Sequence, residues 1–157
     1  MKSLMSRLVL AAVASLVIFA WFAHRGESIV MAEDHAPVMA TRIYSGADGF
    51  THVEQVEVRF PAVPGGSPAA AQSENLRVSN SYVARLAPGF FEDWHNADAR
   101  RYVVPISGRA EIEVGGGQKV MVEPGHIYIA EDLTGKGHTF RVVGKEDWVA
   151  LFVNFAK

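Results

Sequence analysis

From residue 33 onward the chain alternates short runs of β-prone residues with turns built on glycine and proline. In the clearest run, residues 110–114 (AEIEV), apolar and acidic side chains alternate strictly. Alternation with period two places one set of side chains on each face of a strand. No stretch after residue 32 shows a helical period sustained over several turns. The pattern therefore predicts an all-β domain, an antiparallel sandwich or barrel of about eight to ten strands.

Strands are expected at 40–44, 52–60, 76–86, 101–106, 110–114, 119–122, 127–129, 138–143 and 148–155. Residues 61–71 (PAVPGGSPAAA) combine proline, glycine and alanine, and they are predicted to form the least ordered loop inside the domain.

Composition excludes several classes of chemistry. The 157 residues contain no cysteine, which excludes disulfides, thiolate zinc sites, iron–sulfur clusters and a cysteine nucleophile. The formal net charge of −2 gives no electrostatic reason to expect a nucleic-acid partner. An exported domain without disulfides must be stable through its apolar core.

Residues 8–23 (LVLAAVASLVIFAWFA) form an uncharged, mostly apolar block that follows Lys2 and Arg7. A basic start and such a block are typical of an export signal, but the block is slightly short for a spanning helix of roughly 20 residues. Residues 1–32 are thus either a cleaved signal peptide or a membrane anchor, and 33–157 form the domain. Basic residues on the N-terminal side indicate a periplasmic or secreted domain, which touches the membrane only through this segment.

Two segments between Pro88 and Val143 resemble the motifs of the cupin superfamily. The first motif of that family runs from a glycine through His-x-His and a glutamate to a second glycine. Here Gly89, His95, Ala97, Arg101 and Gly108 stand at those positions.

The second cupin motif runs from a glycine through Pro-x-Gly and a histidine to an asparagine. Gly125 and His138 match the glycine and the histidine. Glu131 stands where proline is usual, Val142 stands where asparagine is usual, and the turn before His138 is two residues longer.

The resemblance implies a small β-barrel of the double-stranded β-helix, or jelly-roll, type. It also implies a divalent metal held by histidines and a glutamate, with Mn, Fe, Zn and Ni not distinguished. In this chain only His95 and His138 remain as metal ligands, because Ala97 supplies no ligand and the Arg101 guanidinium repels a cation.

Two interpretations of the site stay open. A carboxylate from Asp98, Glu131 or Asp132 can complete a metal site with the two histidines. Alternatively, an inward Arg101 suits an anionic ligand such as a carboxylate or phosphate. An outward Arg101 is a surface residue or a structural partner of Asp98 or Glu131.

The candidate roles follow from these interpretations. His138, Glu131 and Asp132 are the candidate acid–base groups, Arg101, Trp94 and Phe140 are the candidate substrate-binding residues, and His95 and His138 are the candidate metal ligands. We expect the two histidine rings to converge inside one end of the barrel, within about 8 Å of each other.

Three functions fit the sequence. The first is an exported enzyme acting on a small polar or anionic molecule, and the second is a non-catalytic periplasmic module that binds such a ligand. The third is a structural envelope protein whose barrel has lost its site. Because unpaired sheet edges are a liability, we also expect a homodimer that pairs through them.

Overall fold

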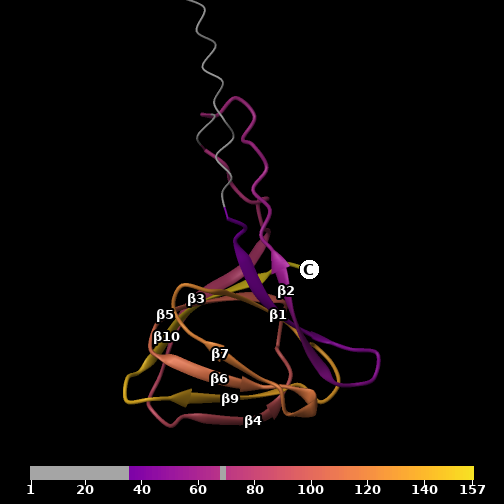
Figure 1. The fold of residues 1–157 in the computed structure, drawn as a ribbon, viewed down its shortest axis with the longest axis vertical. Helices are drawn as coiled ribbons and strands as arrows, with labels where there is room; N and C mark the ends of the chain where they lie inside the picture. Colours follow the sequence, from indigo (N-terminus) through magenta and orange to yellow (C-terminus); the bar gives the residue numbers. More distant parts are fainter. Residues whose placement is uncertain (1–35, 68–69) are drawn as a thin grey trace, which may run out of the picture. The chain divides into compact units, whose positions relative to one another are not determined.

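The computed structural model describes residues 36–67 and 70–157, and Pro37–Lys157 form one compact unit (Figure 1). The regular structure of this unit is almost entirely β-strand, which confirms the all-β prediction. The strands are β1 (Met39–Ser45), β2 (Thr51–Glu57), β3 (Val78–Leu86), β4 (Phe91–His95), β5 (Arg101–Ser107), β6 (Arg109–Glu113), β7 (Lys119–Val122), β8 (Ile127–Glu131), β9 (His138–Val143) and β10 (Trp148–Phe155), with one 3₁₀ turn, η1 (Gly115–Gly117).

The strands form two sheets that pack face to face. One sheet has the order β2-β1-β8-β5-β10-β3, and the other has the order β4-β9-β6-β7. Neighbouring strands are antiparallel except β1 and β8, which run parallel. These two strands are far apart in the chain, so no hairpin turn fixes their relative direction. The prediction of a purely antiparallel barrel is corrected at this one pairing.

Two local predictions also need correction, and a third is confirmed. β4 was not expected as a strand, because its sequence, FEDWH, does not alternate cleanly; pairing with β9 nevertheless holds it extended. β2 ends at Glu57 rather than at Phe60, whose side chain is exposed. The loop at 61–71 is confirmed: among its described residues the only β-contact is an isolated bridge between Ala62 and Ala71.

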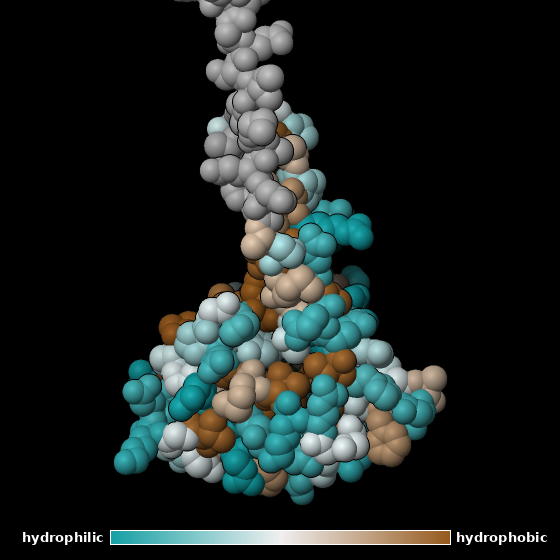
Figure 2. Space-filling view, viewed as in Figure 1, coloured by the Kyte–Doolittle hydropathy of each residue, from teal (hydrophilic) through white to brown (hydrophobic). Residues whose placement is uncertain are grey.

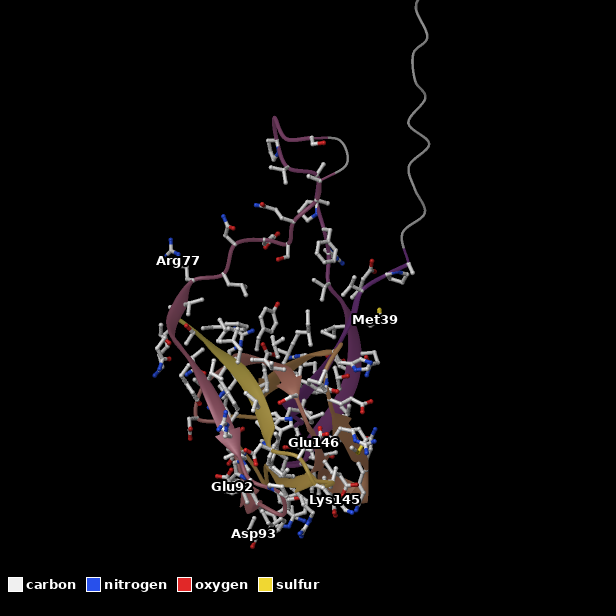
Figure 3. The ribbon with its side chains drawn as sticks, turned by 90° about the vertical axis from the view of Figure 1, so that its left-hand side faces the viewer. Met39, Arg77, Glu92, Asp93, Lys145 and Glu146 are labelled. Atoms are coloured by element: carbon white, nitrogen blue, oxygen red, sulfur yellow. The ribbon has the colours of Figure 1, made fainter. Side chains whose placement is uncertain are left out.

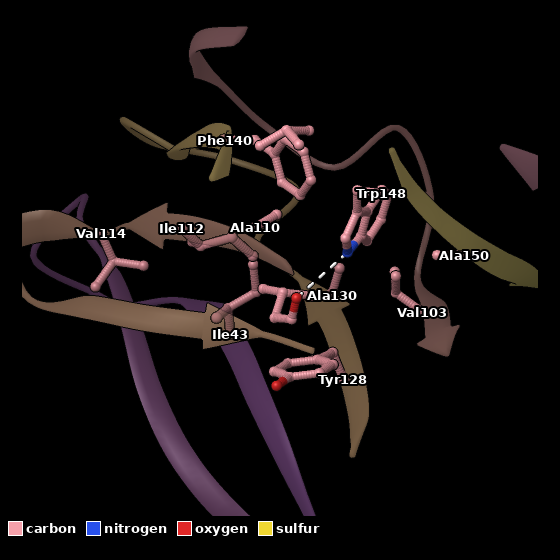
Figure 4. Close-up of a cluster of buried hydrophobic side chains, with 12 residues drawn as sticks. Ile43, Val103, Ala110, Ile112, Val114, Tyr128, Ala130, Phe140, Trp148 and Ala150 are labelled. Atoms are coloured by element: carbon pink, nitrogen blue, oxygen red, sulfur yellow. Dashed lines mark hydrogen bonds between the residues drawn. The ribbon is translucent and has the colours of Figure 1, made fainter. Parts of the chain in front are cut away.

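The core lies between the two sheets (Figure 4). Trp148 is fully buried, and its indole Nε1–H donates to the carbonyl of Val122 at 3.3 Å. The Trp148 ring meets Phe140 edge to face, with 4.9 Å between ring centroids. Ala110 and Ile112 on β6 face the same core, which confirms the predicted alternation. Apolar side chains from both sheets therefore form one core between them.

The face of the domain seen in Figure 2 is mostly polar, with apolar side chains among the polar ones. Met39 and Arg77 lie near one end of the domain, and Glu92 and Asp93 on β4 lie at the other (Figure 3). Within residues 36–67 and 70–157, no helix is long and apolar enough to cross a membrane. The prediction of a signal peptide or anchor at residues 1–32 lies outside the described residues.

Candidate functional site

The two sheets enclose a cavity of about 320 Å³. Ligand-binding pockets in proteins measure roughly 300–1,000 Å³. The walls are mostly apolar, and the acidic and basic side chains that line them are Glu92, His95, Asp98, Arg101 and His138. The cavity can therefore accommodate a small molecule and offers it a few ionisable contacts.

The two motif histidines lie side by side in this cavity. His95 ends β4, His138 begins β9, and the two residues are partners in the register of these strands. Their ring centroids are 4.4 Å apart. The expectation that the rings converge within about 8 Å is therefore confirmed.

Gly137 allows this close pairing. Its φ of +76° lies in the left-handed region, and a Cβ on it would come within 2.0 Å of the carbonyl oxygen of His95. Only glycine meets both requirements without displacing the backbone of β4. The glycine before His138 thus sets the distance between the strands that carry the histidines.

Asp132 orients His138 from behind. The carboxylate is fully buried, and its Oδ2 accepts a hydrogen bond from Nδ1 of His138 at 2.6 Å and one from the Thr51 hydroxyl at 3.2 Å. Its Oδ1 has no hydrogen-bond partner among the described residues. With the proton held on Nδ1, the Nε2 lone pair of a neutral His138 ring points away from Asp132.

His95 is also held through its Nδ1, by a hydrogen bond within its own strand, β4. Its Nδ1 donates to the carbonyl oxygen of Asp93 at 2.7 Å, and its Nε2 lies 3.5 Å from Oε2 of Glu92. Both imidazoles thus use Nδ1 for a structural hydrogen bond. Each Nε2 is left to accept a proton or to bind a ligand.

Arg101 faces the cavity. Its side chain is only 9% exposed, and its guanidinium makes three long polar contacts: Nε to the carbonyl of Ala99 at 3.2 Å, and the terminal nitrogens to the Tyr82 hydroxyl and the Asp98 carboxylate, both at 3.4 Å. The guanidinium carbon lies 5.7 Å from the centroid of the Phe152 ring. The sequence left open whether Arg101 points into the barrel or pairs with Asp98. In the structure it does both.

Glu131 lies outside the cavity, contrary to its predicted acid–base role. Ile129 and Ala130 on β8 line the cavity, but the strand ends at Glu131, whose side chain lies outside it. There Arg42 donates to its carboxylate at 2.7 Å and Arg100 Nε donates at 2.9 Å. Burial alone would raise the pKa of Glu131, but the hydrogen bonds from Arg100 and Arg42 outweigh burial and hold the pKa below its ordinary value.

Of the two aromatic residues predicted to contact a substrate, one lines the cavity and the other does not. Phe140 lines the cavity. Trp94 does not, because it precedes His95 on β4 and its ring is covered by the ammonium group of Lys136, 3.7 Å from the ring centroid. Trp94 therefore does not contact a molecule bound in the cavity.

The side chains as they lie do not fit a bound metal. Ala97 lines the cavity with a methyl group where the cupin motif has a histidine. Within the described part of the chain, no group of three or more metal-ligating side chains converges. The cavity instead offers two imidazoles, and Arg101 adds a positive charge to it.

Glu92 and Tyr82 are among the cavity residues that were not predicted from the sequence. Glu92 has the opposite parity to His95, but the register of β4 shifts between them, so both reach the cavity. Such an irregularity leaves no sequence signal. Tyr82 does share parity with Ala84 and Leu86, which also line the cavity, so the alternation in β3 could have identified it.

No family model matches the chain, and no curated protein matches it. Among solved structures, the chain is similar to a cupin domain from Bordetella pertussis, with a TM-score of 0.42 and 17% identity over 78% of this chain and 98% of that one. It is also similar to a cupin-2 domain containing protein from Shewanella frigidimarina, with a TM-score of 0.37 and 15% identity over 54% and 83% of the two chains.

A de novo designed double-stranded β-helix matches with a TM-score of 0.33 and 25% identity, over 50% of this chain and all of the designed one (100%). The two sheets of this chain enclose a cavity, and its two motif histidines meet there across β4 and β9. The two facing sheets and the pairing of the motif histidines are what the sequence resemblance to cupins predicts. Likenesses at this level indicate neither a ligand nor a reaction for this chain.

Proposed function

We propose that this protein binds a small molecule with an apolar body and a carboxylate group, and that Arg101 anchors the carboxylate. The observation that carries the proposal is the buried guanidinium of Arg101, which faces the cavity and has no partner closer than 3.2 Å. A buried charge is stabilised by close, charge-assisted hydrogen bonds of about 2.7–2.9 Å. A ligand carboxylate can supply two of these in parallel.

The walls near Arg101 support an apolar or aromatic ligand body. The rings of Tyr82 and Phe152 are parallel within 2°, with centroids 5.0 Å apart. Both rings line the cavity, and Phe152 also lies under the guanidinium of Arg101. A ligand with a planar apolar group next to its carboxylate would pack this group against the rings of Tyr82 and Phe152.

An enzyme is the second candidate, favoured by the buried pair of Asp132 and His138. His138 would take a proton from the bound molecule at Nε2, and Asp132 would stabilise the imidazolium that forms. As the side chains lie, no third ligating group among the described residues joins His95 and His138, so a metal-dependent form would require a carboxylate to move toward them.

The setting of this function is also part of the proposal. The basic and apolar N-terminus supports export, with residues 1–32 as signal or anchor and the domain periplasmic or secreted. Pairing through exposed sheet edges supports a homodimer. In the third candidate function, a structural envelope protein, the cavity would bind nothing.

Isothermal titration calorimetry with the full chain tests the proposal, with benzoate and hexanoate as probes and benzamide and hexanamide as their neutral counterparts. We expect the parent protein to prefer each carboxylate over its amide by about tenfold, which is about 1.4 kcal/mol. Arg101→Gln should lose this preference.

Arg100→Gln is the matched control, because it removes the neighbouring arginine, which points away from the cavity. It should keep the preference. Equal binding of carboxylates and amides by the parent would contradict the proposal, and stoichiometric binding of Zn²⁺ or Mn²⁺ by the parent would favour the metal-dependent enzyme. A parent that binds none of these probes would favour the structural protein.

A further inference from the structure

Asp98 is the acidic group that meets Arg101, and it does so from the solvent side. It lies in the irregular segment between β4 and β5, three residues before Arg101. Its side chain is 95% exposed, whereas that of Arg101 is 9% exposed. The pair therefore joins a buried cation to an acid that stands almost entirely in water.

The contact is loose. The distance of 3.4 Å between Oδ2 of Asp98 and the guanidinium nitrogen exceeds the roughly 2.7–2.9 Å of a charge-assisted hydrogen bond. An ion pair with one fully hydrated partner contributes little to stability. Because Asp98 is already hydrated, its carboxylate can leave Arg101 without a large desolvation change.

Asp98 also lines the cavity that Arg101 faces. An entering carboxylate would need the same guanidinium, and two negative groups at one arginine repel each other. The Asp98 carboxylate therefore lies beside the same guanidinium that an anionic ligand would need.

We propose that Asp98 is a built-in competitor for the anion site, whose carboxylate must leave Arg101 before a ligand carboxylate binds there. The inference rests on the proposed function, since it assigns a regulatory residue to the same site. It makes Asp98 a determinant of specificity: an anion that pairs with Arg101 through two hydrogen bonds displaces Asp98, whereas a weakly paired anion does not.

The test measures the affinities of benzoate and benzamide for the parent, Asp98→Asn and Asp147→Asn by calorimetric titration of the full chain. Asp147 is the matched control, because its exposed carboxylate also pairs with an arginine, Arg85, at 3.8 Å, but does not line the cavity. Both variants remove one surface negative charge.

We expect Asp98→Asn to bind benzoate about fivefold more tightly than the parent, which is about 1 kcal/mol. Benzamide affinity should not change, because it carries no charge to compete with Asp98. Asp147→Asn should match the parent with both probes. Asp98→Ser should show the same gain, which separates loss of the carboxylate from any new contact made by the asparagine amide.

Equal benzoate affinities in the parent, Asp98→Asn and Asp98→Ser, with the preference for benzoate over benzamide intact, would overturn the inference and leave the proposed function standing. An equal gain in Asp147→Asn would also overturn it, since net charge would then explain the effect. If none of the proteins prefers benzoate over benzamide, the proposed function itself fails and the inference fails with it.

Discussion

Arg100 and Arg101 are adjacent in the sequence, yet their guanidinium groups meet very different surroundings. Arg100 is outside the cavity and binds the carboxylate of Glu131, a side chain that is 11% exposed and that Arg42 also holds. Arg101 is inside the cavity and has only long contacts with Ala99, Tyr82 and Asp98.

The difference separates a structural arginine from one that remains available. On the outer face, Glu131 is held by two close arginines, and its low pKa reflects that stabilisation. On the inner face, the buried guanidinium has no comparably close carboxylate. A buried charge without a close partner is costly, and this cost is the basis of the proposed carboxylate ligand.

The largest expected effect comes from reversing the inner charge. Arg101→Glu should weaken benzoate binding by about a hundredfold or more, because a paired contact becomes a repulsion. The same change restores the carboxylate of the usual cupin metal site, so the affinity for Mn²⁺ or Zn²⁺ should rise. Calorimetric titration measures both, and unchanged affinities for benzoate and for the metals would remove Arg101 from the site.

Removing the outer carboxylate should have a smaller effect, and on stability alone. Glu131→Gln should lower the free energy of unfolding by about 1–2 kcal/mol, because two arginines lose a charged hydrogen-bond acceptor. Urea denaturation measures the change. Glu111→Gln, which removes an ion pair with the exposed Lys119, is the control and should change stability by less than about 0.5 kcal/mol.

Benzoate affinity should be the same in Glu131→Gln and in the parent. A loss of benzoate binding in the folded variant would show that the inner and outer arginines are not independent, and the comparison drawn above would not hold.

The Glu131 carboxylate should also make the free energy of unfolding depend on pH. Because the pKa of Glu131 is lower in the folded protein than in the unfolded chain, its contribution is fully present above about pH 4.3 and is lost as the pH falls through the folded pKa. The difference in unfolding free energy between the parent and Glu131→Gln should therefore shrink on acidification. A difference that stays constant down to pH 3 would contradict this assignment.

The smallest expected effect concerns the outward face of β4. Lys136→Gln removes the ammonium group over the Trp94 ring and should lower stability by about 0.5–1 kcal/mol. Benzoate affinity should not change, since neither residue lines the cavity. Thermal denaturation measures the stability, and calorimetric titration of the same sample measures the benzoate affinity. A clear loss of benzoate affinity would show that Trp94 belongs to the binding site.

The sequence predicted the barrel because alternation and glycine turns are local signals. It also predicted that His95 and His138 meet, because the spacing of the cupin motifs places them on neighbouring strands. It could not place Glu131 and Arg101, since the face each residue occupies depends on where β8 and β5 begin their alternation. The sequence left the direction of Arg101 open, and in the structure it faces the cavity, whereas Glu131, a candidate acid–base group, lies outside the cavity.

Other features of the site depend on contacts between distant segments. Asp132 follows Glu131 directly and lies behind His138, where Thr51 from β2 also reaches it. Glu92 reaches the cavity through an irregular register between β4 and β9. The contact between Asp132 and Thr51 and the position of Glu92 do not follow from local spacing, because each depends on how separate strands pack in the folded barrel.

A crystal structure of the full chain with benzoate tests the central claim most directly. The account predicts the benzoate carboxylate within hydrogen-bond distance of both terminal nitrogens of Arg101, the phenyl ring beside Tyr82 and Phe152, and the Asp98 carboxylate turned away into solvent. Benzoate bound elsewhere, or bound in the cavity with its carboxylate away from Arg101, would contradict it.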